Sequence, residues 1–208
     1  MSAEQKPDDA DTFAYPALYR NLTEKAFLEQ RNGLRQFEDV LELVREWQGV
    51  LRLTPDVIQN LHAAAIDELY ICAGEFRSGP VGITGSHHTP PPHEEVPGFV
   101  AEMCEYANEN ASREPLETAA YLMWRVNWIH PFFGGNGRTS RAVSYLGLSV
   151  GLKMELPGRL TIPDQIVADR NRYYDALELA HEAWRERRLA LSPLISLLDT
   201  FLRRQLAS

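Results

Sequence analysis

Apolar residues recur three or four positions apart along most of this 208-residue chain, which is the spacing of amphipathic helices. Over residues 19–47 the pattern predicts two helices with a break at Asn32 and Gly33. Residues 54–56, Thr-Pro-Asp, form a helix start, because Thr is a good N-cap and Pro suits the first helical position. Further helices are predicted at 55–72, 96–110, 115–129, 137–152, 163–186 and 192–206. The predicted fold class is mostly α.

The segment from Gly74 to Glu95 breaks the helical pattern with four glycines, four prolines and three histidines in 22 residues. Residues 81–84 are its short extended stretch. An ordered loop or hairpin of this length is unusual in a compact helical domain and is often functional. A plain surface excursion with a polyproline stretch at 90–92 is the alternative interpretation.

Composition limits the function classes. The chain has 21 Lys and Arg against 29 Asp and Glu, a net charge of −8, which argues against duplex nucleic acid as a partner. Residues 1–13 are polar and are predicted to be a flexible lead-in to one domain at 14–208. No signal peptide and no run of eighteen apolar residues is present, so we expect no membrane span. Cys72 and Cys104 are predicted to be reduced buried thiols, and we therefore expect a cytoplasmic protein.

Residues 128–141 carry the candidate chemistry, because an apolar helix ends there, a glycine-rich turn follows and a new helix begins. The glycines allow successive N–H groups to face one concavity at a helix N-terminus, where the helix dipole favours an anion. Arg138 and Arg141 share a helix face in the first turns, which is unfavourable unless an anion is bound. His130 can accept a proton near neutral pH, and Phe132 is the candidate anchor of the loop. Each feature alone is common in ordinary proteins, but the combination predicts a phosphate site beside a base.

Residues 130–141 read HPFxxGNGRxxR, which resembles the signature of the Fic (filamentation-induced-by-cAMP) domain family. The resemblance extends to residues 75–95, which are similar to the family's flap, and to TIPDQIVADRNRYYDALELA at 161–180. It covers about residues 54–190. It implies a Fic-type helical bundle with a short β-hairpin flap.

The resemblance also implies an activity: transfer of a nucleoside monophosphate, AMP or similar, from ATP or another nucleotide to a protein hydroxyl. His130 would be the base, and Arg138 and Arg141 would hold the outer phosphates. The anion hole for the inner phosphates would be formed by Gly135, Asn136 and Gly137. The flap segment that pairs with the protein target would be Ile83, Thr84, Gly85, Ser86 and His87.

One position departs from the family pattern. Gly134 stands where AMP-transferring members have an Asp or Glu that holds Mg²⁺, so this sequence predicts no metal ligand there. Glu94 and Glu95 are candidates only by their position in the chain. The change favours a metal-independent transfer, a different phosphate donor or a binding module without catalysis. Gly137 differs from the Lys of the family's kinase-like branch, which does not favour phosphate transfer.

The self-inhibitory motif of many family members, [S/T]xxxE[G/N], is missing from the sequence. An active protein would then be unrestrained or restrained by a separate inhibitory partner. The resemblance also suggests a homodimer.

Two other interpretations compete with a transferase. Arg125 and His130 fit the Arg-x4-6-His pattern of HEPN ribonucleases, but this pattern leaves residues 135–138 unexplained. Arg125 is interpreted instead as a structural partner of helix-end carbonyls or of a carboxylate such as Glu117.

A catalytically impaired nucleotide-binding module is the second alternative, although such a module does not need His130. His62 and His181 are interpreted as structural or exposed, and the three histidines of residues 87–93 lack a metal-ligand spacing.

Overall fold

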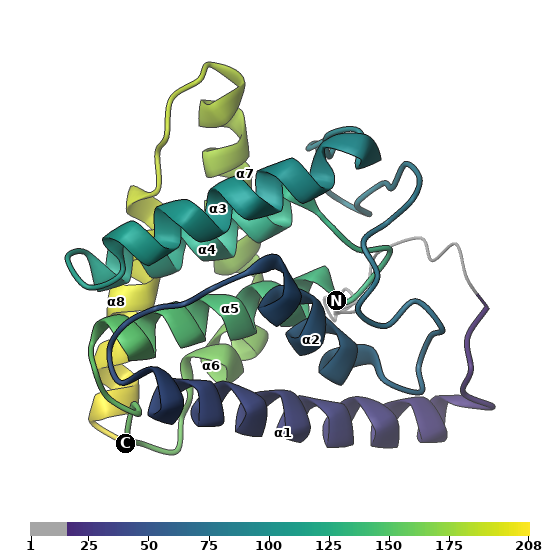
Figure 1. The fold of residues 1–208 in the computed structure, drawn as a ribbon, viewed down its shortest axis with the longest axis horizontal. Coiled ribbons are helices and arrows are strands. Elements are labelled where there is room, and N and C mark those ends of the chain that lie inside the picture. The colour runs from purple at the N-terminus through teal and green to yellow at the C-terminus, as the bar shows by residue number, and fades with distance from the viewer. Residues whose placement is uncertain (1–15) are drawn as a thin grey trace, which may run out of the picture.

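The computed structural model describes residues 16–208, and the described part of the chain is mostly helical, as predicted (Figure 1). The predicted flexible lead-in, residues 1–13, lies outside the described residues. Along the chain the helices are α1 (Leu22–Trp47), α2 (Pro55–Ile66), the short 3-10 helix η1 (His93–Glu95), α3 (Val96–Asn110), α4 (Pro115–Ile129), α5 (Asn136–Gly151), α6 (Ile162–Ala168), α7 (Arg170–Arg185) and α8 (Ser192–Leu206).

Helix α5 is the central element. It packs most extensively on α4 and also contacts α1, α2 and α6, and Figure 1 shows it between α4 and α1. All of its residues except Gly137 and Arg138 are buried. The one part of this helix that is not fully buried is therefore its first turn, which is where the candidate phosphate site was predicted.

Small residues allow α4 and α5 to lie close together. A Cβ at Gly147 would come within 2.7 Å of the Leu122 side chain, and Ser144 Oγ donates a hydrogen bond to the carbonyl oxygen of Ala119 (2.8 Å). Trp124 of α4 is fully buried in the same core. Because α4 ends at Ile129 and α5 begins at Asn136, this packing fixes both ends of the turn between them.

The predicted break at Asn32 and Gly33 is wrong, since α1 continues through it as one helix of 26 residues. The Asn32 side chain is buried, and its Nδ2 donates to the carbonyl oxygen of Asp67 (2.7 Å). This tertiary bond and the packing of α1 on α2 and α5 outweigh the helix penalty of one glycine, about 1 kcal/mol.

Two other boundaries differ from prediction. Helix α2 ends at Ile66 rather than at 72, because the chain turns at Glu68, which has a positive φ of 58°. Leu69 and Cys72 are buried although they follow the end of the helix. Their apolar spacing therefore extended the predicted helix too far. The predicted helix 163–186 is divided at Asp169, whose backbone is not helical, into α6 and α7.

The predicted β-hairpin is not confirmed. Residues 75–92 form an irregular loop with turns and carry no strand assignment beyond an isolated bridge at Ile83. Three of these residues, 90–92, are prolines, which have no N–H to donate to a strand ladder. The loop is held by side-chain hydrogen bonds to α4 and α7 instead, and we call residues 75–92 the flap loop below.

Cys72 and Cys104 are both buried and free, as predicted, and burial raises the pKa of the Cys104 thiol to about 12. Across residues 16–208, no helix combines the length and the apolar character needed to cross a membrane.

Candidate functional site: the turn between α4 and α5

The candidate site is built on the turn from His130 to Gly135. His130 ends α4 in the left-handed conformation (φ 49°), and its N–H donates to the carbonyl oxygen of Val126 (2.9 Å). Gly135 precedes α5 with a φ of 72°. A Cβ at Gly135 would meet the side chain of Ile66 at 2.7 Å and His62 Nε2 at 3.2 Å. Glycine is therefore required at position 135 by both backbone conformation and space.

Asn136 closes the turn from inside. Its Nδ2 donates to the carbonyl oxygen of Phe132 (2.9 Å), and its Oδ1 accepts from the Phe132 N–H (3.0 Å). Phe132 is fully buried and also packs on Phe76, with ring centroids 5.5 Å apart. The Asn136 side chain thus shapes the turn at the start of α5.

His62 of α2 supports the turn from the other side. Its Nδ1 accepts from the Gly74 N–H (3.0 Å), so its Nε2 carries the proton and donates to the carbonyl oxygen of Gly134 (2.9 Å). The ring stacks on Phe132 with centroids 3.6 Å apart. Burial lowers the pKa of His62 to about 3, so it is neutral at physiological pH. Of the two interpretations from the sequence, structural or exposed, the first is correct.

Arg77 is a site residue that the sequence analysis missed. Its Nε donates to the carbonyl oxygen of His130 (2.8 Å), while Nη1 and Nη2 donate to the carbonyl oxygens of Gly79 (3.0 Å) and Pro91 (2.5 Å). One buried guanidinium therefore joins both ends of the flap loop to the residue before the turn. The signal in the sequence that could have identified Arg77 is its position at the start of the loop, three residues after Gly74.

His130 is almost fully buried and lies in a group of histidines. His88 of the flap loop stacks on His181 of α7 with centroids 4.3 Å apart, and its Nε2 lies 2.7 Å from the carbonyl oxygen of Trp128. Burial, and secondarily repulsion from His88 and His130, lowers the pKa of His181 to about 3. The pair beside His130 is therefore uncharged near neutral pH.

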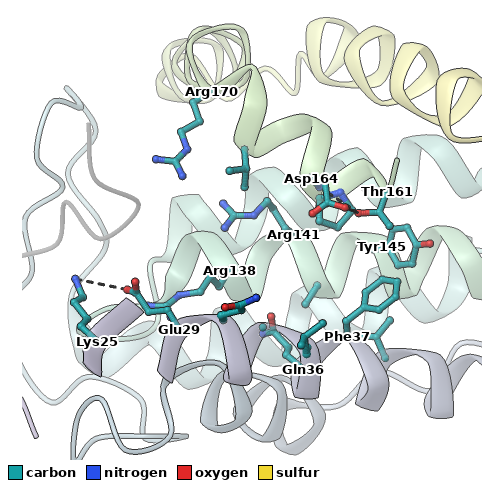
Figure 2. Close-up of a pocket in the computed structure, with 17 residues that line it drawn as sticks. Lys25, Glu29, Gln36, Phe37, Arg138, Arg141, Tyr145, Thr161, Asp164 and Arg170 are labelled. Carbon is teal, nitrogen blue, oxygen red and sulfur yellow. Dashed lines mark hydrogen bonds and ion pairs between the residues drawn. The ribbon is translucent and has the colours of Figure 1, made fainter. Parts of the chain in front are cut away.

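The predicted arginines both line a cavity of about 840 Å³ between α1, α5 and α6. Figure 2 shows the guanidinium groups of Arg138, Arg141 and Arg170 at one side of this cavity. Arg141 is only 7% exposed. The sequence analysis did not single out Arg170, which begins α7, far along the chain from the turn.

Arg138 is held in place by its neighbours. Its Nη1 donates to the carbonyl oxygen of Ala65 at the end of α2 (3.0 Å), and its Nη2 lies 3.9 Å from Glu29 Oε1 of α1. The Glu29 carboxylate lies 3.6 Å from Lys25 Nζ. An anion bound by Arg138 must therefore share this arginine with Glu29.

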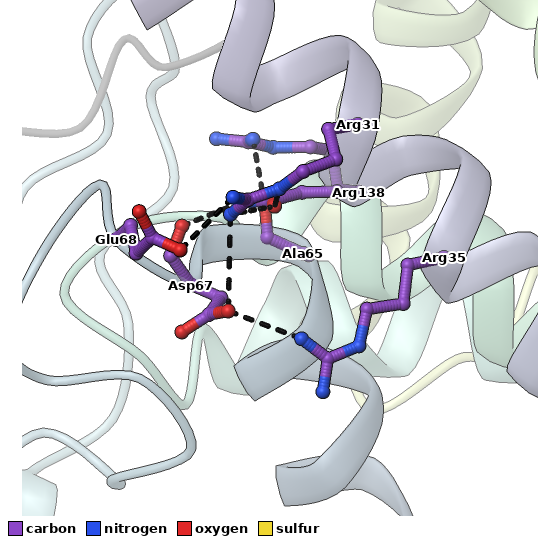
Figure 3. Close-up of polar contacts among 7 residues, drawn as sticks. Arg31, Arg35, Ala65, Asp67, Glu68 and Arg138 are labelled. Atoms are coloured by element: carbon purple, nitrogen blue, oxygen red, sulfur yellow. Dashed lines mark hydrogen bonds and ion pairs between the residues drawn. The ribbon is translucent and has the colours of Figure 1, made fainter.

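Ion pairs between α1 and the end of α2 fix the carbonyl that Arg138 uses (Figure 3). Arg31 pairs with Glu68 (2.9 Å) and Arg35 with Asp67 (3.0 Å), directly after the last turn of α2. These pairs are partly exposed, so each contributes little on its own. Together with the Asn32 bond they anchor the α2 end on α1.

The opposite side of the cavity carries two aromatic rings. Phe37 of α1 and Tyr145 of α5 lie there with ring centroids 5.6 Å apart (Figure 2). Thr161 and Asp164 of the α6 start close this side. The cavity thus combines a cationic end with an aromatic end, a combination that suits a ligand with a phosphate and a less polar group.

The predicted target-binding segment, residues 83–87, lies on α7. Ser86 Oγ donates a hydrogen bond to Glu178, and Arg185 Nη2 donates to the carbonyl oxygen of His87 (2.7 Å). Thr84, Gly85 and His87 are exposed. The segment is accessible, and it is attached by few bonds.

The residues around the turn do not fit a Mg²⁺ site. Gly134 offers no side-chain ligand, and within residues 16–208 no group of three or more His, Cys, Asp or Glu side chains is arranged to hold a metal. Glu94, one of the two positional candidates, lies beside His93 (3.3 Å).

The HEPN interpretation needs Arg125 as the partner of His130. The Arg125 guanidinium is instead enclosed by aromatic rings, with that of Trp128 at 4.5 Å, and its carboxylate neighbour is Glu102 (3.5 Å). The partner is therefore a carboxylate, as one of the sequence interpretations had it, but it is Glu102 and not the example given, Glu117.

Comparisons with known proteins show what this chain is similar to. Residues 52–148 match the Fic/DOC family model. The chain is 33% identical over 135 residues to the Protein adenylyltransferase Fic of Drosophila persimilis and 32% identical to that of Drosophila willistoni, and each match covers 64% of this chain. The chain spans about 25% of the length of these curated relatives.

The fold has counterparts among solved structures. A Fic domain containing signaling protein from Bacteroides thetaiotaomicron matches with a TM-score of 0.71 and 24% identity, over 91% of this chain and 73% of that one. A Fic family protein from Desulfovibrio desulfuricans matches with a TM-score of 0.66 and 23% identity, over 91% and 54%. Residues 52–148, which include the turn between α4 and α5, therefore match the Fic/DOC family.

Proposed function

We propose that this chain is a Fic-type transferase that moves a nucleoside monophosphate, AMP or a close equivalent, from ATP or another nucleotide to a hydroxyl of a protein. The observation that carries the proposal is one turn that joins a histidine to a helix start whose two arginines line a cavity. His130 ends α4, and six residues later the first turn of α5 begins to present Arg138 and Arg141 to a cavity. The names of the curated relatives support a transferase of this type.

In the proposed reaction His130 takes the proton of the target hydroxyl as its oxygen bonds to the α-phosphorus of the donor. The bond between that phosphorus and the bridging oxygen toward the β-phosphate breaks, and the leaving group departs with the electron pair. With ATP as donor, the leaving group is pyrophosphate. The backbone N–H groups of residues 135–137 and the guanidinium groups of Arg138 and Arg141 stabilise the phosphate charge.

The proposed reaction uses no metal ligand from position 134, since Gly134 has no side chain to supply one. A Gly134→Glu variant restores a carboxylate and is expected to make transfer or nucleotide binding depend on Mg²⁺. A variant indifferent to both added magnesium and chelator would contradict the assigned role of position 134.

The protein target is proposed to lie along residues 83–87, the exposed part of the flap loop. Because no hairpin forms there, the target would add main-chain hydrogen bonds to a loop that is held in place by Ser86 and Arg185.

Gly134 also favours a second candidate, a nucleotide-binding module that has lost catalysis. The two functions differ in what His130 does. A binder keeps its nucleotide affinity and transfers nothing whether or not His130 is present.

The deciding experiment is intact-mass spectrometry of the purified protein and a cell lysate fraction after incubation with a panel of nucleotides, with and without Mg²⁺. A mass gain that is lost in His130→Ala and kept in His93→Ala, a matched histidine outside the turn, establishes the transferase and identifies the transferred group. Nucleotide binding without any adduct establishes the binding module.

A further inference from the structure

A second cavity lies beside the flap loop, away from the arginines of α5. Its volume is about 590 Å³, and its walls come from the end of the flap loop, the start of α3 and the ends of α4 and α7. Three aromatic and three cationic side chains line it: Phe99, Trp128, Trp184, Arg125, Arg185 and Arg187. Glu95 is the one acidic residue among those that line it.

Arg125 is the unusual member of this set. Its side chain is 3% exposed and lies under four aromatic rings, with centroid distances from 4.5 Å for Trp128 to 5.6 Å for Trp124. Its Nε and Nη1 atoms are buried without a hydrogen-bond partner among the described residues, and Tyr121 is a further polar neighbour that, together with Glu102, opposes the lowering of the Arg125 pKa by burial. Its Nη2 is 3.5 Å from Glu102, a carboxylate that is 64% exposed.

A guanidinium in this position is only partly compensated. Aromatic faces attract a cation, but they accept no charge-assisted hydrogen bonds, and an exposed carboxylate at 3.5 Å is a weak partner. Burying a charge is costly unless it is paired. An anion in the cavity, which Arg125 helps to line, would strengthen this pairing.

We propose that this cavity binds an acidic side chain, Asp or Glu, of an extended peptide segment that lies along the flap loop. The choice of a peptide as occupant rests on the proposed function, in which the flap loop receives the protein target. The aromatic walls would contact the apolar part of that segment and its neighbours. The site would then select targets that carry a carboxylate close to the modified hydroxyl.

Two observations favour a peptide segment over a free carboxylate. A carboxylate group fills a small part of 590 Å³, whereas a side chain with its neighbouring residues fills much more. In addition, one wall of the cavity is the flap loop itself, which contributes His88. His88 stacks on His181 and is close to His130. A bound peptide can therefore continue from the cavity toward the base.

The test uses an acetylated and amidated nonapeptide with one central Glu flanked by Val and Thr, the same peptide with Gln, and free glutarate. Trp128 and Trp184 line the cavity, so tryptophan fluorescence reports binding without nucleotide or activity. We expect the Glu peptide to bind at least tenfold more tightly than the Gln peptide and glutarate. Equal affinity of the Glu and Gln peptides, or glutarate binding as tightly as the Glu peptide, overturns the proposal.

Variants assign the site. Arg125→Met keeps the bulk under the rings without a charge and is expected to lose the preference for Glu over Gln. Arg187→Gln is expected to weaken Glu-peptide binding about threefold, whereas its exposed neighbour Arg188→Gln, an equal change of charge outside the cavity, leaves it unchanged. If Arg125→Met does not fold, the comparison of Arg187→Gln with Arg188→Gln tests the proposal instead. Equal effects of these two variants on Glu-peptide binding overturn the proposal.

His130→Ala separates this proposal from the proposed function. It abolishes transfer in the mass assay but is expected to bind the Glu peptide as the unaltered protein does. Transfer activity without a Glu preference leaves the transferase standing and removes the acidic subsite.

Discussion

The turn between α4 and α5 and the flap loop are both irregular segments rich in glycine, yet they are held very differently. The turn is fixed by buried contacts from every side: Asn136 bonds both backbone groups of Phe132, and His62 bonds the carbonyl of Gly134. The flap loop is attached at its base by Arg77 and farther out by Ser86 and Arg185. This difference suits their proposed roles, since an anion site must be rigid and a target-binding loop must adapt.

Gly135→Ala is the strongest way to break the rigid turn. The added Cβ meets Ile66 at 2.7 Å in a left-handed backbone, so we expect the free energy of unfolding to fall by about 2–4 kcal/mol. Urea denaturation measures this loss. The matched control is Gly33→Ala in α1, where no atom lies within 4 Å of the new Cβ, and which is expected to be stabilising by about 0.5–1 kcal/mol. Similar results for the two variants would show that the turn is not the constrained segment described.

Arg138→Ala tests the function of the turn without breaking its fold. Loss of a charge-assisted hydrogen bond is expected to weaken nucleoside triphosphate binding by about 1.5–3 kcal/mol. Isothermal titration calorimetry measures the change, with Arg113→Ala, an exposed arginine in the α3–α4 connection, as the control. Unchanged affinity in Arg138→Ala would remove this residue from the site.

Acidification tests the support of the turn by His62. Its pKa falls from 6.5 to about 3 on folding, so between these values the unfolded chain binds more protons than the folded protein. The stabilising contribution of neutral His62 is therefore complete above pH 6.5 and is lost as the pH falls toward 3, by about 1.4 kcal/mol per pH unit. His181 adds a second contribution of the same sign. Unfolding free energies measured at several pH values check this slope, which should be shallower in His62→Gln.

Ser86→Ala is expected to have the smallest effect. It removes the hydrogen bond to Glu178 in a partly exposed segment, so the free energy of unfolding should change by less than about 1 kcal/mol. Limited proteolysis should nevertheless cut residues 75–92 faster. Thr84→Ala, an exposed neighbour in the same loop, is the control, and equal cleavage rates in the two variants would show that the Ser86 bond does not hold the loop.

Much of the fold could be predicted from local signals. Helices α3, α4 and α8 begin and end at the predicted residues, because prolines near their starts and clear apolar spacing mark them. The prediction of a break in α1 failed because a glycine costs a helix only about 1 kcal/mol and tertiary contacts exceed that. The hairpin prediction depended on the short extended stretch at 81–84 and on resemblance to the family, and it was not confirmed for this proline-rich loop.

The sequence by itself determined the helical architecture and the turn with His130 and the arginine pair, because these depend on residue type and short spacings. Only the tertiary structure decided which distant residues complete the site. His62, Arg77 and Arg170 come from three other elements, and Glu29 reaches Arg138 from α1. Their positions follow from how the helices pack around α5, and a pattern of neighbours along the chain carries no information about that packing.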